Sequence, residues 1–139
     1  MSLSKNEKVV LLRRIPLFSE CTKAELIEVA ISADERMAWE GEELTQEGRL
    51  GREFFIVVDG AVAVRRDGRK LADLGQGDWF GEIAILTHKP RTATVTATSQ
   101  VSLLVISDRA FRRLVERSPR IALRVLRSVA DRLEHDRHS

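Results

Sequence analysis

Two oppositely charged side chains, Glu82 and Arg91, flank a short run that starts at Gly81 and leads into the β-prone residues 92–96. The planar guanidinium of an arginine presents a fork of donors that matches two phosphate oxygens. Gly81 lets the backbone approach a ligand closely, and the residues after it predict one short helix whose unpaired N–H groups face an anion. A carboxylate beside a phosphate is repelled unless it accepts a hydrogen bond from the ligand, and a ribose hydroxyl is such a donor. These residue types therefore predict a site for a sugar phosphate.

The charges in this run favour a cyclic form of that ligand. In a 3′,5′-cyclic nucleotide the 2′-OH is the only free ribose hydroxyl, so one acid beside one arginine suits it better than a di- or triphosphate. The sequence also lacks the Gly-x-x-x-x-Gly-Lys-Ser/Thr loop that usually binds triphosphates. Taken singly, Glu82 and Arg91 are most often a solvated ion pair worth under about 1 kcal/mol, and Gly81 is most often a turn residue. Their combination in this order favours a binding site.

The run from Gly81 to Val95 resembles the phosphate-binding cassette of the cyclic nucleotide-binding domain family, which includes bacterial catabolite activator proteins, kinase regulatory subunits and nucleotide-gated channels. The resemblance implies a sensor that binds its ligand without chemistry. It implies that Glu82 accepts the 2′-OH, that Arg91 pairs with the cyclic phosphate and that Gly81 permits the close approach. Further ligand contacts are implied at Ile83, Ala84, Thr92 and Ala93.

Helical patterns at the start of the chain precede the elements that must hold this cassette. Ser4-x-x-Glu7 and Thr22-x-x-Glu25 are both capping-box patterns, which mark helix N-termini. We therefore expect N-terminal helices within residues 1–36.

The middle of the chain, residues 37–107, consists of short β-prone runs punctuated by glycine, such as residues 54–58 before Asp59-Gly60. Such spacing is typical of a small β-roll. The resemblance implies an eight-stranded antiparallel β-roll, also called a double-stranded β-helix or jelly roll, with the cassette at residues 80–95. The expected fold class is mainly β with flanking helices.

Residues 108–139 return to a helical pattern. Ser107 before Asp108 and Ser118 before Pro119 are both good helix starts, so we expect two C-terminal helices. The apolar residues of the last helix are expected to form one stripe, made of Ala122, Val125, Leu126, Val129 and Leu133. That stripe can lie against the roll or against the same helix of a second copy, which predicts a homodimer.

In the family that the cassette resembles, the final helix moves toward the nucleotide and often caps its base. Alignment at Arg132-Leu133 places Asp136 and Arg137 at the capping position, where catabolite activators have hydroxyl residues. A Thr92 hydroxyl could accept from the 2-amino group of a syn guanine. Asp136 or Glu134, in contrast, would favour the 6-amino donor of adenine. We expect cAMP as the ligand, with cGMP as the alternative.

Composition sets the remaining expectations. The 139 residues suit a single domain, 1–139, and 43% hydrophobic with 32% charged residues describes a water-soluble protein. No apolar run reaches the roughly 18 residues of a membrane span, and the N-terminus lacks a secretory signal. The single cysteine, Cys21, allows no intrachain disulfide, so we expect a cytoplasmic location.

Two other function classes fit the residues less well than a sensor does. Nine arginines against five carboxylates in residues 107–139 suggest nucleic acid, but their helical spacing between apolar residues is typical of a solvated face, so we expect no nucleic acid binding through this chain alone. A metal-dependent enzyme is disfavoured because His88, His135 and His138 form no strand-borne triad. We therefore expect no catalysis and no metal or cofactor.

A third alternative keeps the fold and loses the ligand. In such a degenerate interaction module the cassette residues would be free to change, and the intact Gly81, Glu82 and Arg91 argue against it. No effector module is recognisable in the chain, so the regulated activity belongs to a separate partner or to a longer protein.

Overall fold

A computed structural model describes residues 2–138, apart from the side chains of Leu133 and of residues 135–138. The chain begins with α1 (Lys5–Arg13), a 3₁₀ turn η1 (Pro16–Phe18) and α2 (Lys23–Ser32). Both capping boxes are confirmed: Ser4 Oγ accepts from the Glu7 amide at 3.1 Å, and Thr22 Oγ1 accepts from the Glu25 amide at 3.2 Å. These caps satisfy amides that the first helical turn leaves unpaired.

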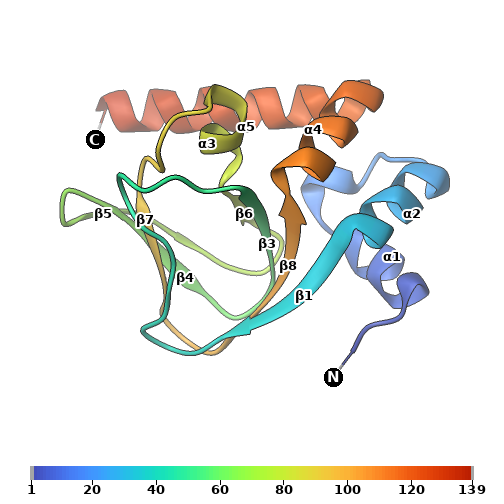
Figure 1. Ribbon diagram of the computed structural model, residues 1–139, viewed down its shortest axis with the longest axis horizontal. Helices are drawn as coiled ribbons and strands as arrows, with labels where there is room; N and C mark the ends of the chain where they lie inside the picture. The colour runs from blue at the N-terminus through green and yellow to red at the C-terminus, as the bar shows by residue number, and fades with distance from the viewer. Residues whose placement is uncertain (1, 139) are drawn as a thin grey trace.

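Within residues 2–138, eight strands form two four-stranded antiparallel sheets (Figure 1). The strands are β1 (Ala33–Ala38), β2 (Glu43–Thr45), β3 (Glu53–Asp59), β4 (Val62–Arg66), β5 (Arg69–Leu74), β6 (Trp79–Phe80), β7 (Thr94–Ala97) and β8 (Val101–Ser107). One sheet has the order β1-β8-β3-β6 and the other the order β2-β7-β4-β5. The expected eight-stranded β-roll is confirmed.

The roll begins four residues earlier than the expected Met37, because β1 starts at Ala33. Residues 33–36 pair with β8, where Ala33 lies opposite Ile106 and Arg36 lies opposite Leu103. Their own sequence, Ala-Asp-Glu-Arg, carries no alternating apolar pattern. The strand is therefore extended by pairing with β8, which sequence periodicity does not reveal.

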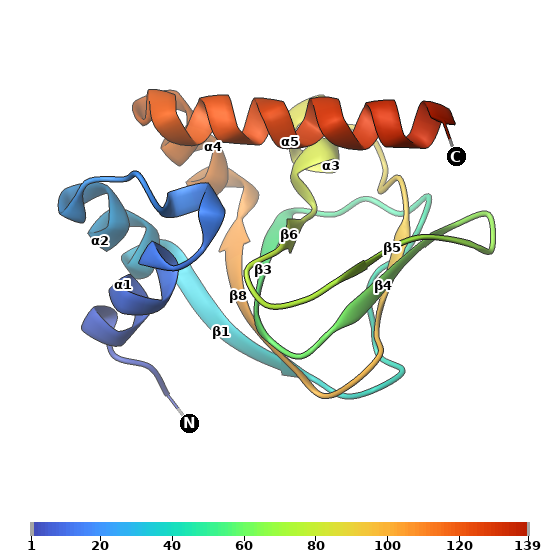
Figure 2. The same cartoon turned by 180° about the vertical axis from the view of Figure 1, so that it is seen from behind.

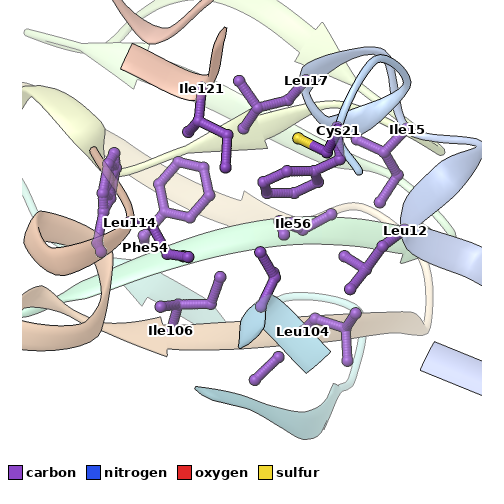
Figure 3. Packing of buried hydrophobic residues seen from close by; sticks show 14 of the residues in the cluster. Leu12, Ile15, Leu17, Cys21, Phe54, Ile56, Leu104, Ile106, Leu114 and Ile121 are labelled. Atoms are coloured by element: carbon purple, nitrogen blue, oxygen red, sulfur yellow. The ribbon is translucent and has the colours of Figure 1, made fainter. Parts of the chain in front are cut away.

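Strand β3 separates two hydrophobic clusters because its side chains alternate between the faces of its sheet. Phe54 and Ile56 face a cluster shared with the helices (Figure 3). In this cluster Phe54 makes an edge-on contact with Phe111, with ring centres 4.5 Å apart. Phe55 and Val57 face the interior of the roll. The sheet is thus covered on one face by helices and on the other by the second sheet.

The C-terminal helices are α4 (Asp108–Arg117) and α5 (Pro119–His138). Both expected helix starts are confirmed, since Ser107 Oγ accepts from the Ala110 amide at 3.2 Å and Ser118 Oγ accepts from the Ile121 amide at 3.3 Å. Helix α5 runs across one end of the molecule and passes α3 (Glu82–Thr87), as the two opposite views agree (Figures 1 and 2).

The expected apolar stripe on α5 lies only partly against the rest of the molecule. Val125 is buried at 2% exposure, whereas Leu126 is 63% exposed. Consecutive helical residues are rotated by about 100°, so Leu126 joins the exposed Leu123 on the outer side. The Leu133 side chain lies outside the described part of the chain.

Candidate functional site

A cavity of about 460 Å³ opens between the cassette, the second sheet and α5. All seven cassette residues expected to contact a ligand line it: Gly81, Glu82, Ile83, Ala84, Arg91, Thr92 and Ala93. The fold therefore gathers residues from both ends of the cassette around one space. The side chains of Asp136 and Arg137, expected to cap a base, lie outside the described part of the structure.

Gly81 provides the turn that brings the chain to the cavity. It is the N-cap of α3 with φ of 98°, a left-handed conformation that glycine adopts at little cost. A Cβ atom at this position would lie 2.7 Å from the Glu53 carbonyl oxygen. Both the conformation and the limited space at position 81 therefore require glycine. The expected short helix, α3, begins at the next residue.

Glu82, the first residue of α3, is a fully buried carboxylate. Its Oε1 accepts from Arg132 Nη1 of α5 at 2.6 Å. Its Oε2 is buried and has no hydrogen-bond partner among the described residues. A buried carboxylate oxygen without a donor is costly, so this atom is suited to a donor that a ligand brings.

Burial raises the pKa of Glu82 above its ordinary value, while the charges of Arg132 and Arg91 act in the opposite direction. Burial also lowers the pKa of Arg91, although an arginine keeps its charge in proteins. The lining of the cavity includes the acids Glu82 and Asp131 and the arginines Arg66, Arg91 and Arg132, an arrangement that leaves positive charge for an anionic ligand.

Arg91 is held by backbone groups from two other segments. It is 7% exposed; its Nη1 donates to the Gly81 carbonyl at 3.0 Å and its Nη2 to the Glu53 carbonyl at 2.8 Å. The guanidinium also lies 6.0 Å from the centre of the Phe55 ring. These contacts fix the guanidinium in the cavity wall, with two of its five N–H donors used by carbonyls.

Arg132 is a site residue that sequence reasoning missed, since it served only to align the end of the last helix. It lies seven residues after the buried Val125 and three after Val129, on the inner side of α5, and that spacing could have identified it. Besides binding Glu82, its Nη2 donates to the Trp79 carbonyl. Trp79 Nε1 in turn donates to Ser128 Oγ at 3.0 Å.

The wall of the cavity opposite the cassette was also missed. Strands β4 and β5 contribute apolar side chains together with Arg66, whose Nε donates to the Thr92 carbonyl at 2.9 Å. The apolar lining residues are Val64, Leu71, Ala72, Leu74, Phe80 and Val95, and the remaining polar ones are Thr45 and Asp131. The alternation of side chains along residues 62–66 predicts that Val64 and Arg66 share one face of a strand. No local pattern predicts that this face lies opposite the cassette.

The structure bears on the other function classes in two ways. Within the described residues, no group of three or more His, Cys, Asp or Glu side chains lies close enough to hold a metal ion. His88 ends α3, and its Nδ1 lies 3.0 Å from Arg112 Nη2; the side chains of His135 and His138 are not described. Of the helices in residues 2–138, none has the length and apolar character needed to span a membrane.

Comparison with known proteins gives a consistent set of similarities. The sequence model of the cyclic nucleotide-binding domain family matches residues 36–118. A cyclic nucleotide-gated potassium channel of Rhizobium etli is 34% identical over 122 residues, which are 88% of this chain and 34% of the channel. The chain therefore spans about a third of the length of this relative.

Solved structures show the same similarity. A cAMP-bound PfPKA-R structure superimposes with a TM-score of 0.88 at 27% identity, covering 94% of this chain and 45% of that one. The catabolite activator protein of Thermus thermophilus superimposes with a TM-score of 0.78 at 28% identity, covering 87% of this chain and 59% of that one.

Proposed function

The chain belongs to the cyclic nucleotide-binding domain family, and we propose that it binds a 3′,5′-cyclic nucleotide in the cavity beneath α5 as a non-catalytic sensor. The observation that carries this proposal is the buried Glu82 Oε2, which lacks a donor among the described residues while two arginines lie beside it. A ribose 2′-OH supplies that donor, and a cyclic phosphate supplies the negative charge.

The cassette residues receive the following roles in this proposal. Arg91 pairs with the cyclic phosphate and Glu82 accepts the 2′-OH, while Gly81 lets the backbone come close. The backbone of Ile83, Ala84, Thr92 and Ala93 provides the remaining cassette contacts. The apolar side chains of β4 and β5 contact the base, since an aromatic ring is well accommodated by an apolar wall.

We propose cAMP as the ligand. The similarity to the cAMP-bound PfPKA-R structure supports this choice, as does Asp131, a cavity-lining acceptor on α5 that suits the 6-amino group of adenine. One observation favours cGMP instead: Thr92 also lines the cavity, where its hydroxyl can accept from the guanine 2-amino group. Titration with both nucleotides separates the two.

Helix α5 is the element that we propose transmits ligand binding to the effector, through its movement. Its C-terminal half is tied to the cassette by Arg132, and its N-terminal half is tied to the N-terminal segment, where Arg124 forms an ion pair with Glu20 at 3.0 Å and Arg117 of α4 binds Glu28 at 3.0 Å. A ligand that binds one position of α5 more tightly shifts the helix toward it, and a 100-fold preference corresponds to about 2.7 kcal/mol. Residues 1–139 therefore act as one domain in this proposal.

The partners of the sensor are proposed from its relatives and its surface. The effector is a channel, a kinase or another protein of the kind that carries this domain. A second copy of the chain is the proposed contact of the outer face of α5, where Leu123 and Leu126 are exposed. The compartment is proposed to be the cytoplasm, where cyclic nucleotides act as signals.

Arg91→Ala tests the proposed function. We expect this variant to lose about 2 to 5 kcal/mol of cAMP binding free energy, because a buried phosphate is left without its charge partner. Arg65→Ala is the matched control, since Arg65 is exposed on the same strand as Arg66 and does not line the cavity. Dissociation constants from fluorescence titration check the expectation, and an unchanged value for Arg91→Ala contradicts it.

A further inference from the structure

The segment from Gly48 to Glu53, between β2 and β3, surrounds Arg91 from outside the cassette. The Gly48 amide donates to the Arg91 carbonyl at 2.9 Å, and the Arg91 amide donates to the Arg49 carbonyl at 2.8 Å. The Glu53 carbonyl accepts from Arg91 Nη2 at 2.8 Å. The backbone and the side chain of Arg91 are therefore both held by backbone groups of one distant segment.

Gly51 lies against the guanidinium itself. A Cβ atom built on Gly51 would lie 1.9 Å from Arg91 Nε, 2.4 Å from Cζ and 2.5 Å from Nη2. Such separations are far inside van der Waals contact, so the Arg91 side chain occupies the space that any side chain at position 51 needs.

Conformation does not explain this glycine. Six of the eight glycines have positive φ, and Gly51 is not among them. An alanine could adopt its backbone, so the requirement for glycine is steric.

The guanidinium has little room to yield. Gly81 lies on another side, where an added Cβ would be 2.9 Å from Arg91 Nη1, and the side chain is 7% exposed. A displaced guanidinium therefore gives up one or both of its carbonyl bonds to Gly81 and Glu53.

Arg91 also forms part of the wall between two hollows. It lines the 460 Å³ cavity and, on its other side, a surface groove of about 410 Å³ formed largely by residues 43–53. The groove side is where the Gly48–Glu53 segment supports the arginine.

We infer that Gly51 is a positioning residue for nucleotide affinity: its missing side chain forms the slot that holds the Arg91 guanidinium in the cavity wall. The inference rests on the proposed function, because the affinity at stake is that of the cyclic phosphate for Arg91. It places a determinant of affinity forty residues before Arg91, outside the cassette.

Gly51→Ala tests the inference, with Gly75→Ala as the matched control. Gly75 is the other glycine without a positive φ, and the nearest atom to an added Cβ there is 3.8 Å away. We expect Gly51→Ala to weaken cAMP binding about tenfold or more, which is part of the loss caused by removing the arginine. Gly75→Ala should stay within about twofold of the wild type.

A double-mutant cycle separates positioning from a general structural effect. When Arg91→Ala is already present, adding Gly51→Ala should change the cAMP dissociation constant less than about twofold, because the group it displaces is gone. Melting temperatures should follow the same pattern, with a loss in Gly51→Ala that Arg91→Ala relieves. If Gly51→Ala does not fold, recovery of folding in the double variant supports the steric contact, and continued misfolding overturns it.

The outcomes also separate this inference from the proposed function. Wild-type binding with an unchanged or tighter dissociation constant in Gly51→Ala overturns the role of Gly51 and leaves the sensor standing. An equal loss with and without Arg91 overturns it as well. A folded wild type that binds neither cAMP nor cGMP overturns both proposals.

Discussion

Glu82 is a charged side chain that the fold buries completely and supplies with a partner on only one of its two oxygens. Burial raises its pKa, since a carboxylate is less well solvated there than in water. In the protein by itself, an ionised Glu82 is therefore a source of instability. A ligand hydroxyl that donates to Oε2 relieves it, so the same burial that destabilises the protein favours binding.

Glu82→Gln tests whether the ionised, buried Glu82 destabilises the folded protein, through the pH dependence of stability. The pKa of Glu82 in the folded protein lies above the ordinary 4.5, so the folded state holds this proton more tightly than the unfolded state. Wild-type stability is then lost as the pH rises past 4.5 toward the folded pKa, whereas glutamine does not titrate. We expect the variant to melt about 3 °C higher than the wild type at pH 7 and at nearly the same temperature at pH 4.

Thermal unfolding by circular dichroism across this pH range measures the effect. Glu116→Gln, on an exposed position of α4, is the control and should melt with the wild type at every pH. A Glu82→Gln variant that is less stable at pH 7 than at pH 4, relative to the wild type, would show that the ion pair with Arg132 outweighs burial. The same variant should bind cAMP more weakly, because its amide is a poorer acceptor for the ribose hydroxyl.

Helix α5 is held by a buried polar contact at one end and by apolar packing at the other. Ile121 and Val125 are buried near its start, while Arg132 reaches Glu82 and the Trp79 carbonyl near its end. Among the described side chains of its C-terminal half, Val129 packs against the cluster shared with the helices and Arg132 makes these polar contacts. A segment held by few buried contacts opens locally more readily than a packed core. This asymmetry suits an element that moves when a ligand binds.

Arg132→Ala should release the C-terminal half of α5 and leave its beginning in place. We expect amide hydrogen exchange in residues 126–134 to accelerate about tenfold, with little change in residues 119–125. Arg127→Ala, at an exposed position of the same helix, is the matched control. Exchange measured by mass spectrometry checks this, and equal protection in Arg132→Ala and wild type would contradict the proposed tether.

The sequence predicts the helices that begin with a capping side chain. The caps at Ser4, Thr22, Ser107 and Ser118 were correctly identified because a side chain near the helix start bonds to its own backbone. The start of β1 was placed too late, because its strand conformation depends on pairing with β8. The sequence left open which residues of the α5 stripe contact the roll, because a wide stripe of apolar residues does not fix how the helix is rotated.

In the site, too, residues with local signals were predicted and residues that act through distant contacts were not. Gly81, Glu82 and Arg91 were found because the cassette is one continuous run, and all three line the cavity. Arg132 and Gly51 were missed because each acts on that run from a distant part of the chain. Their contacts follow from how α5 and the β2–β3 segment lie in three dimensions, which no local spacing encodes.

In the whole molecule, the proposed nucleotide site and the proposed contact between copies lie on opposite sides of α5. The inner side faces the cavity, and the outer side carries Leu123 and Leu126, at 47% and 63% exposure. A second copy packed on that outer face would couple the position of α5 in one chain to its position in the other, since a shared helix interface transmits small shifts.

Leu126→Glu tests the proposed contact between copies. Light scattering at high protein concentration should give a dimeric mass for the wild type and a monomeric mass for the variant, because a charge opposes burial of that face. Its melting temperature as a monomer should stay close to that of the wild type, since the position is exposed. A monomeric wild type at all concentrations contradicts the proposed dimer and does not affect the nucleotide site.

The central claim is that Glu82 and Arg91 meet around one cyclic nucleotide, and isothermal titration calorimetry of the wild-type chain with cAMP tests it most directly. We expect saturable binding of one nucleotide per chain, with weaker binding of 5′-AMP, whose phosphate is open and more highly charged. Folded protein that gives no binding heat and no rise in melting temperature with either cAMP or cGMP would contradict the account.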